Sequence, residues 1–186
     1  MDDIAIRNNL LGILVGLVPT LSKAATQALN GLLDRPKMLA AAQEAARADD
    51  DTALAPFVFE ALRFDPLNPM IYRRAARDTV IAANTLRQRT IPSGTMVLAA
   101  NLSAMFDRQR VASPNSFQPG RPWEHYLLWG DGLHTCFGAS INRAVLPAIL
   151  KPLLQKRMLR RAPGKLGRID TGATPFPQHM HVTFQL

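Results

Sequence analysis

The sequence has 186 residues and an apolar share of 47%, which is enough for one domain with a sizeable core and excludes a disordered chain. The single cysteine excludes an internal disulfide framework and any multi-cysteine zinc or iron–sulfur site. The net charge is +8, but aromatic residues are not interleaved with the basic ones as stacking platforms, so no nucleic-acid partner is expected.

The positive charge is concentrated in one stretch. Between residues 137 and 169 there is no Asp or Glu, and the eight basic residues there account for the whole net charge: Arg143, Lys151, Lys156, Arg157, Arg160, Arg161, Lys165 and Arg168. One interpretation is a solvated basic face. The other is a docking surface for an acidic partner protein, whose approach the charge would steer.

The N-terminus lacks the features of a targeting segment. The acidic start, Met1-Asp2-Asp3, has the wrong charge for a signal peptide. The most apolar run, Leu10 to Leu21, has 12 residues, whereas a membrane span needs about 20. We therefore expect a protein without a membrane span, located in the cytoplasm.

The first third of the chain is expected to be helical. Apolar residues occur at nearly every helical phase in residues 2–33, which predicts a long helix buried on most sides and kinked at Pro19. Residues 37–47 are rich in strong helix formers. A third helix is predicted over residues 53–64, where Asp65-Pro66 ends it.

The remainder alternates between short strands, loops and one further helix. The predicted segments are strands joined by turns in 68–100, a proline-rich meander in 113–122, a glycine-rich loop in 129–138, a helix in 139–159 despite Pro147 and Pro152, and a strand pair in 171–186. No repeat or boundary divides residues 1–186, so one mainly α domain with a small β portion is expected.

The strongest chemical pattern surrounds the cysteine, in the run Trp-Gly-Asp-Gly-Leu-His-Thr-Cys-Phe-Gly at 129–138. Glycines before and after Cys136 let the backbone turn tightly and approach a flat ligand closely. The helix predicted to follow directs its N-terminal N–H groups toward the sulfur, which favours the thiolate. A thiolate held in this way is a soft ligand for iron.

This run resembles the haem-binding loop of the cytochrome P-450 family, Phe-Gly-x-Gly-x-(His/Arg)-x-Cys-x-Gly, with Trp129 in place of the first Phe. The resemblance implies haem b as cofactor and Cys136 as the axial ligand of its iron. It further implies that the loop contacts the cofactor through the side chains of His134, which would pair with a propionate, and Trp129, which would shield the sulfur, and through Gly130, Gly132 and Gly138.

Two further motifs agree with this family. Glu60 and Arg63 match its Glu-x-x-Arg motif, and residues 117–121 match its Phe-x-Pro-x-Arg meander, which ends here at Arg121. The i,i+3 spacing places Glu60 and Arg63 on one helix face, although most such pairs are surface salt bridges. The resemblance implies instead that Glu60, Arg63 and Arg121 form a buried structural triad behind the cysteine loop.

Residues 69–78 resemble the family's Arg-x-Ala-x-x-Asp strand, whose first arginine binds the second haem propionate. Arg73 occupies that position. Arg74 is a possible substitute, because the guanidinium fork suits either role.

The first helix departs from the family pattern (Ala/Gly)-Gly-x-(Asp/Glu)-Thr-(Thr/Ser), in which the acid and the alcohol deliver protons to iron-bound oxygen. Thr20 can occupy the alcohol position, but Pro19 then replaces the acid. A register shifted by one residue places Val18 and Pro19 at the two positions, so neither register supplies a carboxylate. The resemblance covers essentially the whole chain and implies the C-terminal half of the fold, from the distal helix onward, with the N-terminal half absent.

The function that the resemblance implies is a monooxygenase, which inserts one atom of O2 into an apolar small-molecule substrate with electrons from a partner, and the basic stretch would then dock an acidic electron-transfer protein. One alternative is a hydroperoxide-rearranging enzyme of the wider family that needs no reductant. The other is a non-catalytic haem-binding remnant. His179 and His181 alternate on a predicted strand and, without a third ligand, are expected to be surface residues.

Overall fold

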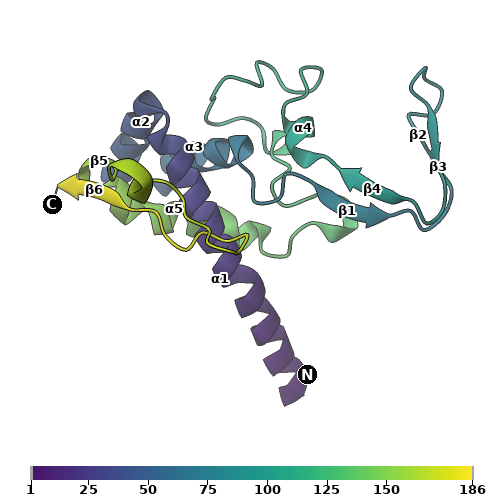
Figure 1. The fold of residues 1–186 in the computed structure, drawn as a ribbon, viewed down its shortest axis with the longest axis horizontal. Coiled ribbons are helices and arrows are strands. Elements are labelled where there is room, and N and C mark those ends of the chain that lie inside the picture. The colour runs from purple at the N-terminus through teal and green to yellow at the C-terminus, as the bar shows by residue number, and fades with distance from the viewer. Residues whose placement is uncertain (1, 186) are drawn as a thin grey trace.

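The computed structural model describes residues 2–185 and shows a helical body with three small antiparallel sheets, as predicted from the sequence (Figure 1). Its helices are α1 (Asp3–Leu33), α2 (Pro36–Arg47), α3 (Asp51–Phe64), α4 (Asn101–Met105) and α5 (Ala139–Leu154), with the short 3-10 helices η1 (Trp123–His125), η2 (Gly132–His134) and η3 (Gly164–Gly167). Its strands are β1 (Ile71–Arg74), β2 (Thr79–Ile81), β3 (Arg89–Ile91), β4 (Met96–Ala99), β5 (Arg157–Arg161) and β6 (Val182–Gln185).

The core lies where the C-terminal half of α1 packs with α2, α3 and α5. Ala28, Leu32, Leu54, Val58 and Leu154 are completely buried there. α1 and α3 approach each other closely at a glycine, because a Cβ atom on Gly31 would lie 3.2 Å from Cβ of Ala61. The core therefore fixes the direction in which α1 leaves the body.

The N-terminal half of α1 extends away from this body (Figure 1). Ile4, Leu11 and Val15 are 62%, 61% and 65% exposed, and burial begins only near Ala24. The predicted helix is present, but the expectation that it is buried on most sides is wrong for this half. The apolar pattern predicts that these side chains pack against another element, and no element among residues 2–185 packs against them.

By length and composition α1 could cross a membrane, since its apolar part is long enough and none of that part is buried. The 12-residue apolar run underestimated this helix, because Ile4 and Ile6 extend its apolar part toward the N-terminus. Core helices of soluble proteins share these properties. The absence of a membrane span stays a prediction.

The predicted strands between residues 68 and 100 are present. β1 pairs with β4 in the register Ile71 to Ala99, and β2 pairs with β3 beyond them, so that this ribbon projects from the body (Figure 1). The prediction for the tail is wrong in its pairing. β6 pairs with β5, whose first three residues lie inside the predicted helix 139–159, because α5 ends at Leu154 and the chain becomes extended from Arg157.

The contact between α1 and α3 gives a first prediction. Gly31→Leu should destabilise the fold by about 1–3 kcal/mol, because the added side chain meets Ala61 in a packed core. Gly12→Ala in the same helix is the matched control. A Cβ there meets nothing within 4 Å, so the change should leave stability equal or slightly higher. Urea unfolding measures both, and an unchanged midpoint for Gly31→Leu would contradict the packing described.

Candidate functional site

The cysteine loop is closed by one backbone hydrogen bond. The N–H of Cys136 donates to the carbonyl of Trp129 at 2.9 Å, and the N–H of Ala139 donates to the carbonyl of Cys136 at 3.1 Å. Inside the turn that the first bond closes, Gly130 and Gly132 have φ angles of +73° and +72°, which are strained for residues with a Cβ atom. The loop thus leads directly into α5 and leaves the Cys136 side chain exposed.

Cys136 borders two cavities, of about 190 and 570 Å³. Four residues border both of them: Gly16 and Thr20 from α1, and Cys136 and Asn142 from the loop and α5. The cysteine loop and the middle of α1, which are more than a hundred residues apart in the sequence, therefore face each other across one site. The lining is largely apolar, which is typical of sites for small organic ligands.

Thr20 occupies the α1 side of this site. Its hydroxyl donates to the backbone carbonyls of Gly16 and Leu17, one turn earlier in its own helix. α1 continues through Pro19, which has no N–H to donate to the carbonyl of Val15. α1 therefore contributes the Thr20 hydroxyl but no carboxylate to the lining of the site, and the Val15 carbonyl, one turn before Pro19, lacks its helical donor.

Trp129 belongs to an aromatic cluster beneath the loop. Its ring centroid lies 5.5 Å from that of Phe59 and 5.8 Å from that of Trp123. Arg143, from the first turns of α5, stacks over Trp123 at 4.0 Å and lies 5.5 Å from the Trp129 ring. These contacts anchor the start of the loop to α3 and α5. Within residues 2–185, the indole N–H of Trp129 makes no hydrogen bond to the Cys136 sulfur.

The two predicted propionate contacts lie at the edge of the site. His134 is exposed on η2, within the loop. Arg73 is on β1, two residues after Ile71, which borders the smaller cavity together with Cys136. Alternate residues of a strand share a face, so Arg73 lies on the cavity side and Arg74 on the opposite side. Arg74 instead donates to the carbonyl of Gly94 at 3.1 Å, so the placement favours Arg73.

The structure brings Glu60, Arg63 and Arg121 together in the interior. Arg63 Nε and Nη2 donate to the two carboxylate oxygens of Glu60 at 3.0 and 2.9 Å, a bidentate pair with both side chains completely buried. Arg121 Nε donates to Glu60 Oε1 at 3.1 Å. This network is buried, and the alternative of a surface salt bridge is excluded.

Two members of the site could not be found from the motifs. The Tyr126 hydroxyl donates to Glu60 Oε2 at 3.2 Å, and burial, together with the Glu60 charge, raises the pKa of Tyr126. Arg143 was counted only as part of a basic stretch, although it stacks on two tryptophans. In the sequence the signal for Arg143 is a single cation among the otherwise uncharged residues at the start of α5.

The donor set fits an iron porphyrin. The exposed sulfur of Cys136 is the kind of soft ligand that holds haem iron, and it borders a largely apolar space between α1 and the loop. No group of three or more His, Cys, Asp or Glu side chains in residues 2–185 could hold a bare metal ion. His179 accordingly pairs with Asp170, at 3.3 Å, and its ring lies 5.3 Å from that of His181.

The fold and this site define a haem-thiolate protein. The model of the cytochrome P-450 family matches residues 1–165, so the chain belongs to that family, whose cofactor is haem b. The solved structure of cytochrome P-450 TbtJ1, without ligand, is 26% identical and superposes with a TM-score of 0.76, covering 100% of this chain and 47% of that one.

Two curated relatives have different names. The bifunctional dioxygenase–epoxy alcohol synthase of Pyricularia oryzae is 25% identical over 165 residues, which are 86% of this chain and 14% of that protein. The cytochrome P-450 monooxygenase DoxA of a Streptomyces species is 38% identical over 98 residues, which are 52% of this chain and 22% of that protein. The chain thus spans less than a quarter of the length of either relative.

The buried network gives the second prediction. Glu60→Gln keeps the shape of the side chain but leaves two guanidinium groups without a counter-charge in the interior, so it should cost about 3–5 kcal/mol of stability. Asp49→Asn, which breaks the exposed ion pair with Lys151, is the control and should change the unfolding midpoint little. Thermal unfolding compares them. Equal midpoints for the two variants would contradict a structural role of the triad.

Proposed function

We propose that the chain is the thiolate-bearing part of a cytochrome P-450 monooxygenase, which inserts one oxygen atom from O2 into an apolar small molecule. The observation that carries this proposal is the placement of Cys136 and Thr20 on the walls of the same two cavities. When bound, haem supplies oxygen activation at its iron. Support also comes from the relative of 38% identity that is named a monooxygenase.

Each residue of the site has a separate task in this function. Cys136 supplies the thiolate, held in place by the N–H···O bond to Trp129. His134 and Arg73 bind the propionates from the loop and from β1. Thr20 holds or passes protons at its hydroxyl, together with water at the Val15 carbonyl that Pro19 leaves without a donor. Apolar residues around the cavities exclude bulk water.

A second candidate is the rearrangement of hydroperoxides without a reductant. The observation that favours it is the absence of a carboxylate beside Thr20, since a hydroperoxide is already reduced and protonated and needs no protons delivered to O2. The similarity to the Pyricularia protein named dioxygenase–epoxy alcohol synthase agrees with this candidate. It is not better supported than the monooxygenase.

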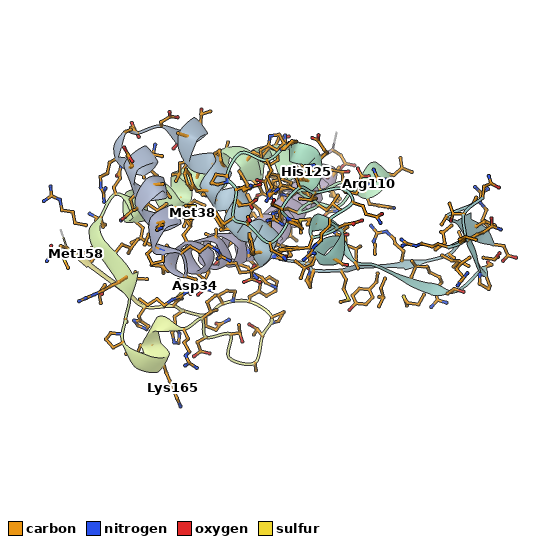
Figure 2. All side chains as sticks on the ribbon, turned by 90° about the horizontal axis from the view of Figure 1, so that it is seen from above. Asp34, Met38, Arg110, His125, Met158 and Lys165 are labelled. Atoms are coloured by element: carbon orange, nitrogen blue, oxygen red, sulfur yellow. The ribbon has the colours of Figure 1, made fainter. Side chains whose placement is uncertain are left out.

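We also propose an acidic electron-transfer partner at the basic 137–169 stretch, and a cytoplasmic location. Two of the eight basic residues are already in ion pairs within the chain, which leaves fewer of them to bind a partner. Lys151 pairs with Asp49 and Asp51, and Arg161 pairs with Asp34. Arg143 stacks on Trp123. The other basic residues of the stretch lie in or beside β5 and η3, in the segment that carries Met158 and Lys165 and lies apart from His125 (Figure 2).

Ligation by Cys136 gives the third prediction. The chain reconstituted with haem, reduced and bound to CO, should show the red-shifted Soret band typical of thiolate ligation. Cys136→Ser should lose that band, because a serine oxygen does not replace the soft sulfur donor. Absorption spectroscopy measures both. A Cys136→Ser protein that kept the thiolate spectrum would remove the basis of the proposal.

The fourth prediction separates the two candidate enzymes at Thr20. General acid assistance is worth about 10²–10⁴-fold, and Thr20 supplies the only hydroxyl group of residues 16–21. In a monooxygenase, Thr20→Ala should therefore raise the hydrogen peroxide released per electron pair consumed, at the expense of product. In a hydroperoxide-rearranging enzyme the same change should matter little. Ser22→Ala, an exposed position on the same helix, is the control.

The measurement for Thr20→Ala is the ratio of product to reductant, with a fatty-acid hydroperoxide tested separately without reductant. Turnover of the hydroperoxide alone would overturn the monooxygenase in favour of the second candidate. Turnover of either kind would contradict a non-catalytic haem-binding remnant. Unchanged coupling in Thr20→Ala would remove Thr20 from the mechanism.

A further inference from the structure

A polar residue occupies the end of a leucine ridge on α5. Leu146, Leu150 and Leu154 follow one another at four-residue spacing and are 2%, 4% and 0% exposed. The same spacing places Asn142 at the next position toward the N-terminus of the helix. Asparagine is a poor residue in a helix interior, and burying its carboxamide costs free energy unless it is hydrogen-bonded. Packing alone would place a leucine there.

The carboxamide of Asn142 is not satisfied by the protein. Its Oδ1 atom is buried and has no hydrogen-bond partner among the residues that the structure describes. An unpaired buried acceptor costs about 1–3 kcal/mol. Departures of this kind from a well-packed core are typical of functional positions. The orphaned oxygen therefore indicates a role beyond the stability of α5.

Asn142 lies next to the sulfur of Cys136. The backbone N–H of Asn142 donates to the backbone carbonyl of Gly138 at 2.8 Å, so Asn142 lies one helical turn after that glycine. Side chains of a helix lean toward its N-terminus, here toward the cysteine loop. A Cβ atom on Gly138 would be 3.7 Å from Cys136 Sγ and 3.8 Å from Asn142 Nδ2. The sulfur and the amide nitrogen therefore both border the space that the missing side chain of Gly138 leaves.

We propose that Asn142 is a positioning residue of the haem-thiolate site, whose side-chain N–H donates to the Cys136 sulfur when that sulfur is the iron ligand. Because Oδ1 makes no hydrogen bond, none holds the carboxamide in an orientation that keeps its N–H away from the sulfur. This inference rests on the proposed function, because it acts through Cys136. A donor to a thiolate withdraws negative charge from the sulfur, and hydrogen bonding around the ligand is one of the means by which a protein tunes haem iron.

The direction of the effect follows from the charge on the sulfur. A thiolate without the hydrogen bond donates more strongly to iron and stabilises the oxidised state, so the reduction potential falls. A carboxylate at the same position adds negative charge and lowers it further. We therefore expect the potential to decrease in the order wild type, Asn142→Leu, Asn142→Asp, with a shift of the Soret band of the reduced CO complex in both variants.

The experiment combines this order with a stability measurement. The haem-reconstituted chain and its variants are titrated spectroelectrochemically, and the thermal midpoint of the cofactor-free chain is measured in parallel. Asn142→Leu should keep or raise that midpoint, because it extends the leucine ridge and removes an unpaired acceptor. Ser140→Ala, an exposed position on the first turn of α5, is the control and should alter neither property.

Three results would overturn the inference. An unchanged potential and Soret band in Asn142→Leu would show that no hydrogen bond reaches the sulfur. A large loss of stability in the cofactor-free Asn142→Leu chain would assign Asn142 to packing. A wild-type chain without a thiolate Soret band would overturn the proposed function itself, and with it this inference. A normal wild-type spectrum with unchanged variants would leave the proposed function intact and refute only the role of Asn142.

Discussion

The buried carboxylate of Glu60 is the constraint on which the rest of the structure depends. A charge taken out of water is tolerated only when its hydrogen bonds are complete, and Glu60 meets this condition with Arg63, Arg121, the Tyr126 hydroxyl and the backbone N–H of Gln118. The two guanidinium groups in turn donate to backbone carbonyls of α4 and of the meander between residues 112 and 116. Segments without regular hydrogen bonding are thereby fixed to α3, and the chain that leaves Tyr126 enters the cysteine loop from a defined place.

The parts that could be predicted from the sequence are those that a local pattern encodes. The cysteine loop depends on glycines at fixed positions, two of which have positive φ angles, and the Glu60–Arg63 pair depends on i,i+3 spacing within one helix. The pairing of β5 with β6 could not be predicted, because β5 follows α5 without a proline or glycine to mark the boundary, and Pro147 and Pro152 lie inside the helix they were expected to interrupt. Tyr126 contacts Glu60, and Arg143 contacts Trp123. Such contacts between segments distant in the sequence leave no periodic pattern from which they could be predicted.

The exposed half of α1 is a second case in which the sequence pattern does not identify the contacts of an element. Its apolar residues predict burial correctly as a tendency, but a pattern within one helix does not identify the element that covers it. The chain spans 47% of the solved cytochrome P-450 TbtJ1, and the residues between 3 and 18 have no cover among the described elements. The described lining of the two cavities consequently comes from α1 on one side and mainly from the cysteine loop, α5 and β1 on the other. The thiolate side, by contrast, is complete in its own contacts, since α3, α5 and the aromatic cluster all anchor that loop.

Besides Cys136, two polar side chains border both cavities, and their hydrogen bonding differs in a way that bears on chemistry. The Thr20 hydroxyl donates to carbonyls of its own helix, so it must give up a bond worth about 1 kcal/mol before it can donate to a ligand. The buried Asn142 oxygen makes no hydrogen bond that a ligand would have to displace. Thr20, by contrast, donates to a ligand only where a stronger acceptor than the helix carbonyls appears. An anionic oxygen is such an acceptor, because hydrogen bonds to charged groups are roughly twice as strong as neutral ones. In the proposed function, the helix would thus keep the Thr20 proton until negative charge develops beside it, which is the order of events that controlled proton delivery requires.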